Sequence, residues 1–135
     1  MTKQFYLDTS IWLDFYEKRE QNGVYALQFI ITCLQKKYVI LYSDLIIKEL
    51  KQLNYKKQQI EEIFSLVKPS HLKRVHIYNQ QILEAKKLAS QRKIPRNDAL
   101  HAILSRDNDA QLITRDKDFQ KLKDITKSEL PELDI

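Results

Sequence analysis

Short β-prone segments alternate with longer segments of helical periodicity along this chain, and no other feature restricts the possible folds as strongly. The β-prone segments cover residues 3–8, 38–43, 73–78 and 110–116. Between them, apolar residues recur at helical spacing in the sets Val24, Leu27, Ile31 and Leu34; Ile60, Ile63, Phe64 and Val67; and Ile82, Leu83, Ala85 and Ala89. This alternation predicts an α/β sandwich, in which helices cover both faces of a mainly parallel sheet.

The size and composition predict a single domain over residues 1–135. The chain has one glycine, three prolines and no repeat or linker-like segment. Its one cysteine, Cys33, lies in an apolar pattern, so we expect a core residue in a protein from a reducing compartment. No apolar segment approaches the roughly 20 residues that span a bilayer. We therefore expect a cytoplasmic protein without a membrane partner, complete from Met1.

Four acidic residues occupy positions where parallel α/β sheets gather their ligands, beyond the carboxyl ends of the strands. Asp8 and Asp116 each follow a β-prone segment directly. Glu49 falls between Leu45 and Leu53 on the apolar arc of the helix predicted for residues 43–53. Asp98 stands just inside a predicted helix that follows Pro95. Each acid also has a structural interpretation, as a helix cap, a first-turn acid or the partner of a lysine.

Taken together, the four acids predict a cation site. The chain carries 23 basic and 18 acidic residues, a net charge of +5, which makes nucleic acid a plausible partner. If the acids converge, each pair repels by about 4 kcal/mol at ~4 Å and an effective dielectric constant of ~20. Such a cluster persists only if protons or a divalent cation neutralise it. Oxygen ligands favour Mg²⁺ or Mn²⁺ over zinc.

The sequence resembles the PIN-domain ribonucleases, and among them the VapC-like toxins of toxin–antitoxin pairs. The resemblance rests on YLDTSIW, SDLIIKEL, NDALHAILS and LITRDKDF, which follow one another in the family's order over nearly the whole chain. It implies a three-layer α/β/α sandwich whose central, mainly parallel sheet has four or five strands. It also implies metal-dependent hydrolysis of single-stranded RNA, and hence a hydrolase.

The resemblance also assigns roles to individual residues. It places the catalytic and metal-binding acids at Asp8, Glu49, Asp98 and Asp116, with Mg²⁺ or Mn²⁺ as the cofactor. Ser10 and Thr114 are the hydroxyl residues expected to orient these carboxylates. Asp109 and Asp118 are alternatives to Asp116 as the last ligand. His101 stands where many members carry an aliphatic residue, and we expect it to pack or hydrogen-bond rather than bind metal.

Three basic residues flank the acids: Arg96, Arg115 and Lys117. They either contact the RNA backbone or are simply solvated. Trp12, Tyr16 and the two helices within residues 43–67 either line an exposed groove or belong to the core. In the toxins that the sequence resembles, such helices support homodimerisation and antitoxin binding.

Two other functions are considered. A PIN-like module that binds RNA or protein without catalysis would also fit the fold. A haloacid-dehalogenase-like phosphatase would need a second aspartate two residues after Asp8, where this chain has Ser10.

Overall fold

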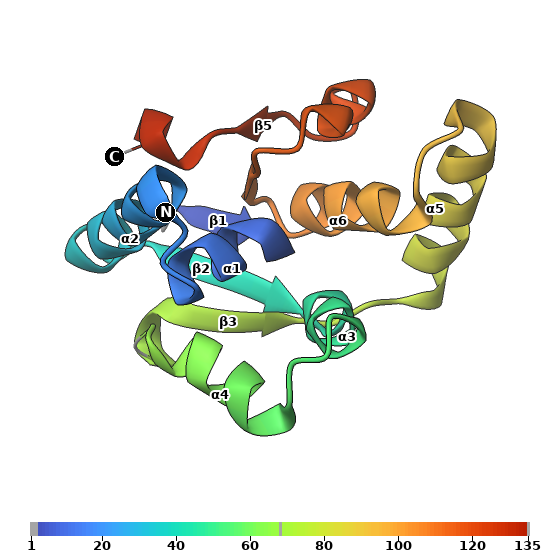
Figure 1. The fold of residues 1–135 in the computed structure, drawn as a ribbon. Coiled ribbons are helices and arrows are strands. Elements are labelled where there is room, and N and C mark those ends of the chain that lie inside the picture. The colour runs from blue at the N-terminus through green and yellow to red at the C-terminus, as the bar shows by residue number, and fades with distance from the viewer. Residues whose placement is uncertain (1–2, 68, 135) are drawn as a thin grey trace.

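A five-stranded, all-parallel sheet forms the centre of the computed structural model, which describes residues 3–67 and 69–134 (Figure 1). The strands are β1 (Gln4–Leu7), β2 (Val39–Ser43), β3 (Leu72–Val75), β4 (Gln111–Ile113) and β5 (Ser128–Glu129), in the spatial order β3-β2-β1-β4-β5. Every neighbouring pair is parallel. The predicted mainly parallel sheet of four or five strands is thus confirmed.

Six α-helices connect and cover the strands: α1 (Thr9–Tyr16), α2 (Glu20–Gln35), α3 (Asp44–Gln52), α4 (Lys57–Ser65), α5 (Asn79–Arg92) and α6 (Arg96–Asp107). Short 3₁₀ helices follow at η1 (Pro69–His71), η2 (Lys117–Leu122) and η3 (Pro131–Asp134). Helix α1 packs against α2, and α5 packs against α6. The helices flank the sheet to give the expected α/β/α sandwich. Among the described residues, no helix is both long and apolar enough to cross a bilayer.

Polar residues at the carboxyl ends of the strands also start the elements that follow. The Asp8 carboxylate accepts from the backbone N–H of Thr9 at the start of α1, at 2.7 Å. Ser43 Oγ accepts from the N–H of Ile46 in α3, at 3.4 Å, and Asp116 caps η2. The capping interpretation is therefore confirmed for Asp8 and Asp116. Because all strands run in one direction, these caps meet at one edge of the sheet.

The core is rich in aromatic rings. Phe5 and Phe29 pack edge to face at 5.0 Å between ring centroids, and Trp12 packs on Phe64 at 4.9 Å. Trp12 is fully buried, so of the two alternatives for this residue the structure supports the core and not the exposed groove. Cys33 is buried, as predicted.

Two sequence predictions differ from the structure in detail. The segment expected as a strand over residues 73–78 forms only Leu72–Val75, after which the chain leaves the sheet edge toward α5. The face of α2 that contains Val24, Leu27 and Ile31 is 42–44% exposed. This helix is apolar on both sides, and the side that carries Phe29 packs into the core.

Gly23, the only glycine of the chain, allows α2 to approach the turn that follows α1. A Cβ atom at this position would lie 2.8 Å from the carbonyl oxygen of Asp14 and 2.8 Å from the carbonyl carbon of Lys18. Both atoms belong to the backbone and cannot rotate away. We expect Gly23→Ala to lower the free energy of unfolding by about 2 kcal/mol, although alanine favours helices. Urea unfolding measures this change.

Asn22→Ala is the matched control, because Asn22 is exposed on the same helix turn. It should leave the unfolding free energy within about 0.5 kcal/mol of the wild type. Equal stability of the two variants would contradict the close approach at Gly23.

Candidate functional site

The four acids predicted from the sequence line one cavity of about 500 Å³. Asp8 lies between β1 and α1, Glu49 on α3, Asp98 in the first turn of α6, and Asp116 between β4 and η2. Thr9, Ser10 and Arg19 also line this cavity. Four separate segments thus bring their carboxylates to the carboxyl edge of the sheet.

Asp8 is held by three donors. Its Oδ1 accepts from the backbone N–H of Thr9, and its Oδ2 accepts from the hydroxyls of Ser10 (3.2 Å) and Thr114 (2.9 Å). Thr114 Oγ1 in turn accepts from the backbone N–H of Asp116 at 3.0 Å. Ser10 and Thr114 therefore both contact Asp8, and Thr114 links this acid to the backbone of Asp116.

Glu49 also has three hydrogen-bond partners, all of them side chains. Its Oε1 accepts from Thr9 Oγ1 at 2.6 Å and lies 2.7 Å from His101 Nε2, while its Oε2 accepts from Asn97 Nδ2 at 3.2 Å. Burial alone would raise the pKa of Glu49, but these hydrogen bonds and the nearby imidazole lower it below its ordinary value. The side chain is consequently ionised at neutral pH.

The pKa of Asp98 is shifted in the opposite direction to that of Glu49. Burial, followed by the negative charges of Asp116 and Asp8, raises its pKa to about 6. Burial is the largest cause of this shift, and the repulsion expected of converging carboxylates adds to it.

The two other acidic candidates, Asp118 and Asp109, lie in different places. Carboxylate oxygens of Asp98, Asp116 and Asp118 lie within 4.8 Å of one another, so Asp118 adjoins the site from its exposed side. Asp109 lines a different cavity, together with Lys3 and Gln4 at the opposite end of the strands. The structure therefore separates Asp109 from the four acids.

His101 is 1% exposed and uses both ring nitrogens within the protein, Nε2 toward Glu49 and Nδ1 toward the Tyr6 hydroxyl at 2.7 Å. Its Nε2 also lies 4.0 Å from Asp8 Oδ1. To bind a cation, Nε2 would have to give up its contact with Glu49. The geometry accordingly agrees with a hydrogen-bonding residue rather than a ligand.

The sequence matches the family model of the PIN domain over residues 5–125. The chain belongs to the PIN domain family. No curated protein matches it in sequence.

Solved structures share the fold of this PIN domain at low sequence identity. The structure of VapBC-1 from nontypeable Haemophilus influenzae is similar with a TM-score of 0.69 and 21% identity, over 95% of this chain and 98% of that one. VapBC2 from Rickettsia felis, bound to a DNA fragment from its promoter, is similar with a TM-score of 0.66 and 20% identity, over 94% of this chain and 96% of that one. A toxin–antitoxin complex from Klebsiella pneumoniae is similar with a TM-score of 0.63 and 18% identity, over 94% of this chain and 97% of that one.

Two contacts of the PIN site were not predicted from the sequence. Thr9 and Asn97 each stand next to a predicted acid, yet both donate to Glu49, which lies at least 40 residues away. The sequence offers only one indication that these two residues belong to the site, namely that each adjoins a predicted acid. The contacts depend on how α1, α3 and α6 meet, which no local pattern encodes.

The flanking basic residues lie in different environments. Arg96 and Lys117 are exposed at the starts of α6 and η2. Arg115 instead makes a bidentate ion pair with Glu132 at 2.9 and 3.0 Å, and its guanidinium lies over the Tyr25 ring. Arg115 thus links the end of β4 to the C-terminal segment that contains Glu132.

The donor set suits a hard divalent cation. Carboxylates supply the oxygens, hydroxyls orient them, and burial together with two neighbouring negative charges raises the pKa of Asp98. The residues present therefore fit Mg²⁺ or Mn²⁺.

The Asp98 pKa makes the metal-free protein less stable as the pH rises. Between the ordinary value of 3.8 and about 6, folded Asp98 retains a proton that the unfolded chain has lost, so stability falls over this range and stays low above it. In EDTA at pH 7.5, we expect Asp98→Asn to be more stable than the wild type by about 1 kcal/mol, a discounted value for a partly exposed side chain. This corresponds to a rise of about 3 °C in Tm.

Thermal unfolding at pH 4 and pH 7.5 measures the effect. The advantage of Asp98→Asn should shrink at pH 4, and Mg²⁺ should raise the Tm of the wild type more than that of the variant. A variant that is less stable than the wild type at both pH values would contradict the unbalanced charge.

Proposed function

We propose that this PIN domain is a metal-dependent endoribonuclease that hydrolyses single-stranded RNA. Asp8, Asp98 and Asp116 would bind Mg²⁺ or Mn²⁺, and Glu49 would bind the metal or orient the attacking water. The convergence of four carboxylates in one cavity of a basic PIN domain carries this proposal.

The residues of the site suit hydrolysis of a phosphodiester. A bound divalent cation supplies contact with a phosphate oxygen, a lowered pKa for a bound water, and stabilisation of charge on the leaving oxygen. The donors around Asp8 keep its carboxylate fixed at the wall of the cavity. The ionised Glu49 would accept a proton from the attacking water or hold that water. In-line attack by the water would then break the P–O3′ bond and leave a 5′-phosphate and a 3′-hydroxyl.

The basic residues at the rim would hold the RNA backbone. We assign this role to Arg96 and Lys117, because both are exposed and adjoin catalytic acids. Arg19 also lines the cavity. Its guanidinium lies 3.5 Å from the Asp14 carboxylate, and its side chain is about half exposed. Arg115 is left out of this set because of its pairing with Glu132.

The most direct test compares Asp8→Asn with Asp109→Asn. Both changes replace a carboxylate by an amide, but only Asp8 lines the cavity. We expect Asp8→Asn to lower Mn²⁺-dependent cleavage of single-stranded RNA by at least about 10³-fold, because the metal loses a ligand. Asp109→Asn should cleave at the wild-type rate. A labelled RNA resolved on a denaturing gel measures both.

Unchanged cleavage by Asp8→Asn would exclude the proposed site. An inactive wild type, tested on varied RNAs with both metals, would instead favour the alternative of a PIN-like binding module. Calorimetric titration with Mg²⁺ separates these cases, since a binding module should show no uptake that depends on the acids.

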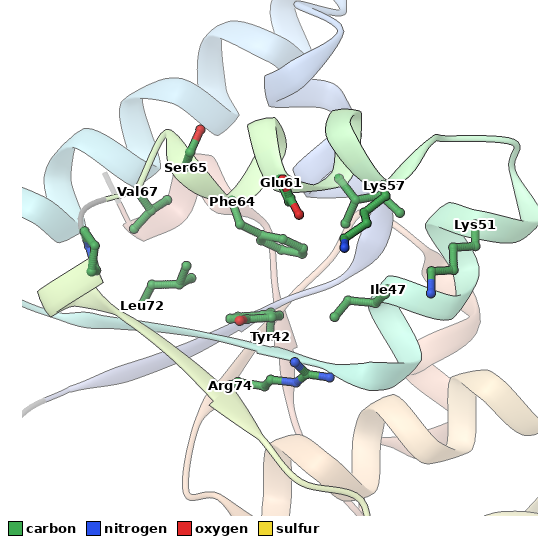
Figure 2. Close-up of a pocket in the computed structure, with 12 residues that line it drawn as sticks. Tyr42, Ile47, Lys51, Lys57, Glu61, Phe64, Ser65, Val67, Leu72 and Arg74 are labelled. Atoms are coloured by element: carbon green, nitrogen blue, oxygen red, sulfur yellow. The ribbon is translucent and has the colours of Figure 1, made fainter.

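A groove between α3, α4 and the sheet supports a protein partner. Its volume is about 750 Å³. Figure 2 shows Phe64 of α4 facing Tyr42 of β2, with their rings stacked at 4.4 Å, and Lys51 and Lys57 at the end nearest α3. Apolar walls beside lysines fit a segment that combines apolar and acidic side chains. We propose that an antitoxin docks here, in line with the toxin–antitoxin complexes that share this fold.

This groove was expected from the helices within residues 43–67, but its lining differs from the expectation. Trp12 belongs to the core, and the Tyr16 hydroxyl donates to Glu62 at 2.7 Å outside the groove.

The exposed face of α2 supports the proposed homodimer. Val24, Leu27 and Ile31 follow a spacing of three and four residues, and α2 has no charged residue after Glu20. Such a face fits the same face of a second copy, because burying it leaves no charge unpaired.

We expect the wild type to be a dimer and Leu27→Glu to be a monomer, because the new carboxylate would be buried between the two copies. Asn22→Glu is the control: it adds the same charge at an exposed position on the other side of the helix. Light scattering after gel filtration measures the mass. A monomeric wild type, or an unchanged Leu27→Glu dimer, would contradict this assignment of α2.

A further inference from the structure

A buried series of polar side chains lies behind Glu49, and the proposed chemistry does not use it. His101 Nδ1 lies 2.7 Å from the Tyr6 hydroxyl, and this hydroxyl lies 2.7 Å from Ser43 Oγ. Tyr6 and Ser43 are fully buried and His101 is 1% exposed. The series begins at the cap of α3 and returns to the same helix at Glu49, through β1 and α6.

Packing alone does not account for an imidazole at this position. A buried polar group costs free energy unless its hydrogen bonds are satisfied, whereas an aliphatic side chain would fill the space without that cost. Tyr6 and Ser43 can satisfy each other without His101. What the imidazole adds is therefore its contact with Glu49.

The direction of this contact follows from the partners. Both oxygens of Glu49 already accept hydrogen bonds, Oε1 from Thr9 and Oε2 from Asn97, so in the contact with His101 the ring nitrogen Nε2 is the donor. A neutral ring would then accept at Nδ1 from Tyr6, and a charged ring would donate there while Tyr6 donates to Ser43. Because either hydroxyl can turn, Nε2–H donates to Glu49 in both cases.

Counting lone pairs shows what this donation does. An ionised carboxylate has about four acceptor sites, two on each oxygen. Thr9 and His101 occupy both sites on Oε1, and Asn97 occupies one on Oε2. One site on Oε2 remains.

We propose that His101 is a positioning residue which, with Thr9, fills Oε1 of Glu49 and leaves Oε2 as the single oxygen that faces the cation or the attacking water. The inference rests on the proposed nuclease function, since it names the oxygen of Glu49 that this function uses. The Tyr6–Ser43 pair fixes the ring so that Nε2 stays directed at Oε1.

Substitution by leucine or glutamine separates positioning from packing. His101→Leu fills a similar volume but donates nothing, whereas the amide nitrogen in His101→Gln can still donate to Glu49. With single-stranded RNA and Mn²⁺, we expect His101→Leu to lower kcat by about 10- to 100-fold and to leave KM within about twofold. His101→Gln should recover at least about tenfold of this loss. Wild-type kcat in His101→Leu, or equal losses in both variants, would overturn the proposal.

A spectroscopic measurement on the wild type does not depend on whether cleavage occurs or on the stability of His101→Leu. The ¹H–¹⁵N spectrum of the imidazole groups, assigned by the signal that disappears in His101→Gln, should show a slowly exchanging proton on Nε2 of His101. An Nε2 without a proton would overturn the inference. A protonated Nε2 in a protein that cleaves no RNA would refute the nuclease function and leave the bond to Glu49 standing.

Discussion

The partial burial of converging carboxylates at one edge of the sheet is the constraint on which the rest of this structure depends. Four acids share a cavity, and the pKa of Asp98 rises to about 6 because burial and two neighbouring charges oppose its ionisation. The protein balances only part of this charge, through N–H and O–H donors around Asp8 and Glu49. A site that keeps charge unbalanced at a cost in stability is organised for a ligand of the opposite sign.

The parallel topology creates this constraint and also limits its cost. Each strand directs its carboxyl end toward the same edge, where free N–H groups at the start of the next element donate to an acidic side chain. Asp8 and Asp116 therefore serve as caps and as walls of the cavity at once. The capping and functional interpretations of these residues do not compete, because one carboxylate has enough lone pairs for both.

Local rules predicted the acids but not their surroundings. Asp8 and Asp116 follow from the ends of strands, and Glu49 follows from its phase on α3, because both depend on a few consecutive residues. The contacts of Thr9 with Glu49 join distant segments, and adjacency to an acid misleads for Arg115, whose guanidinium contacts the C-terminal segment. Local rules also could not predict which side of α2 is buried. Both sides of this helix are apolar, and only the packing of the whole core decides which side faces inward.

Crystals grown with Mn²⁺ and measured for anomalous scattering test the central claim most directly. The account predicts an anomalous peak in the cavity, within bonding distance of oxygens of Asp8 and of at least one of Asp98 and Asp116, with Glu49 turned toward it through Oε2. A fully occupied manganese elsewhere, with these carboxylates bonded only to protein and water, would contradict it.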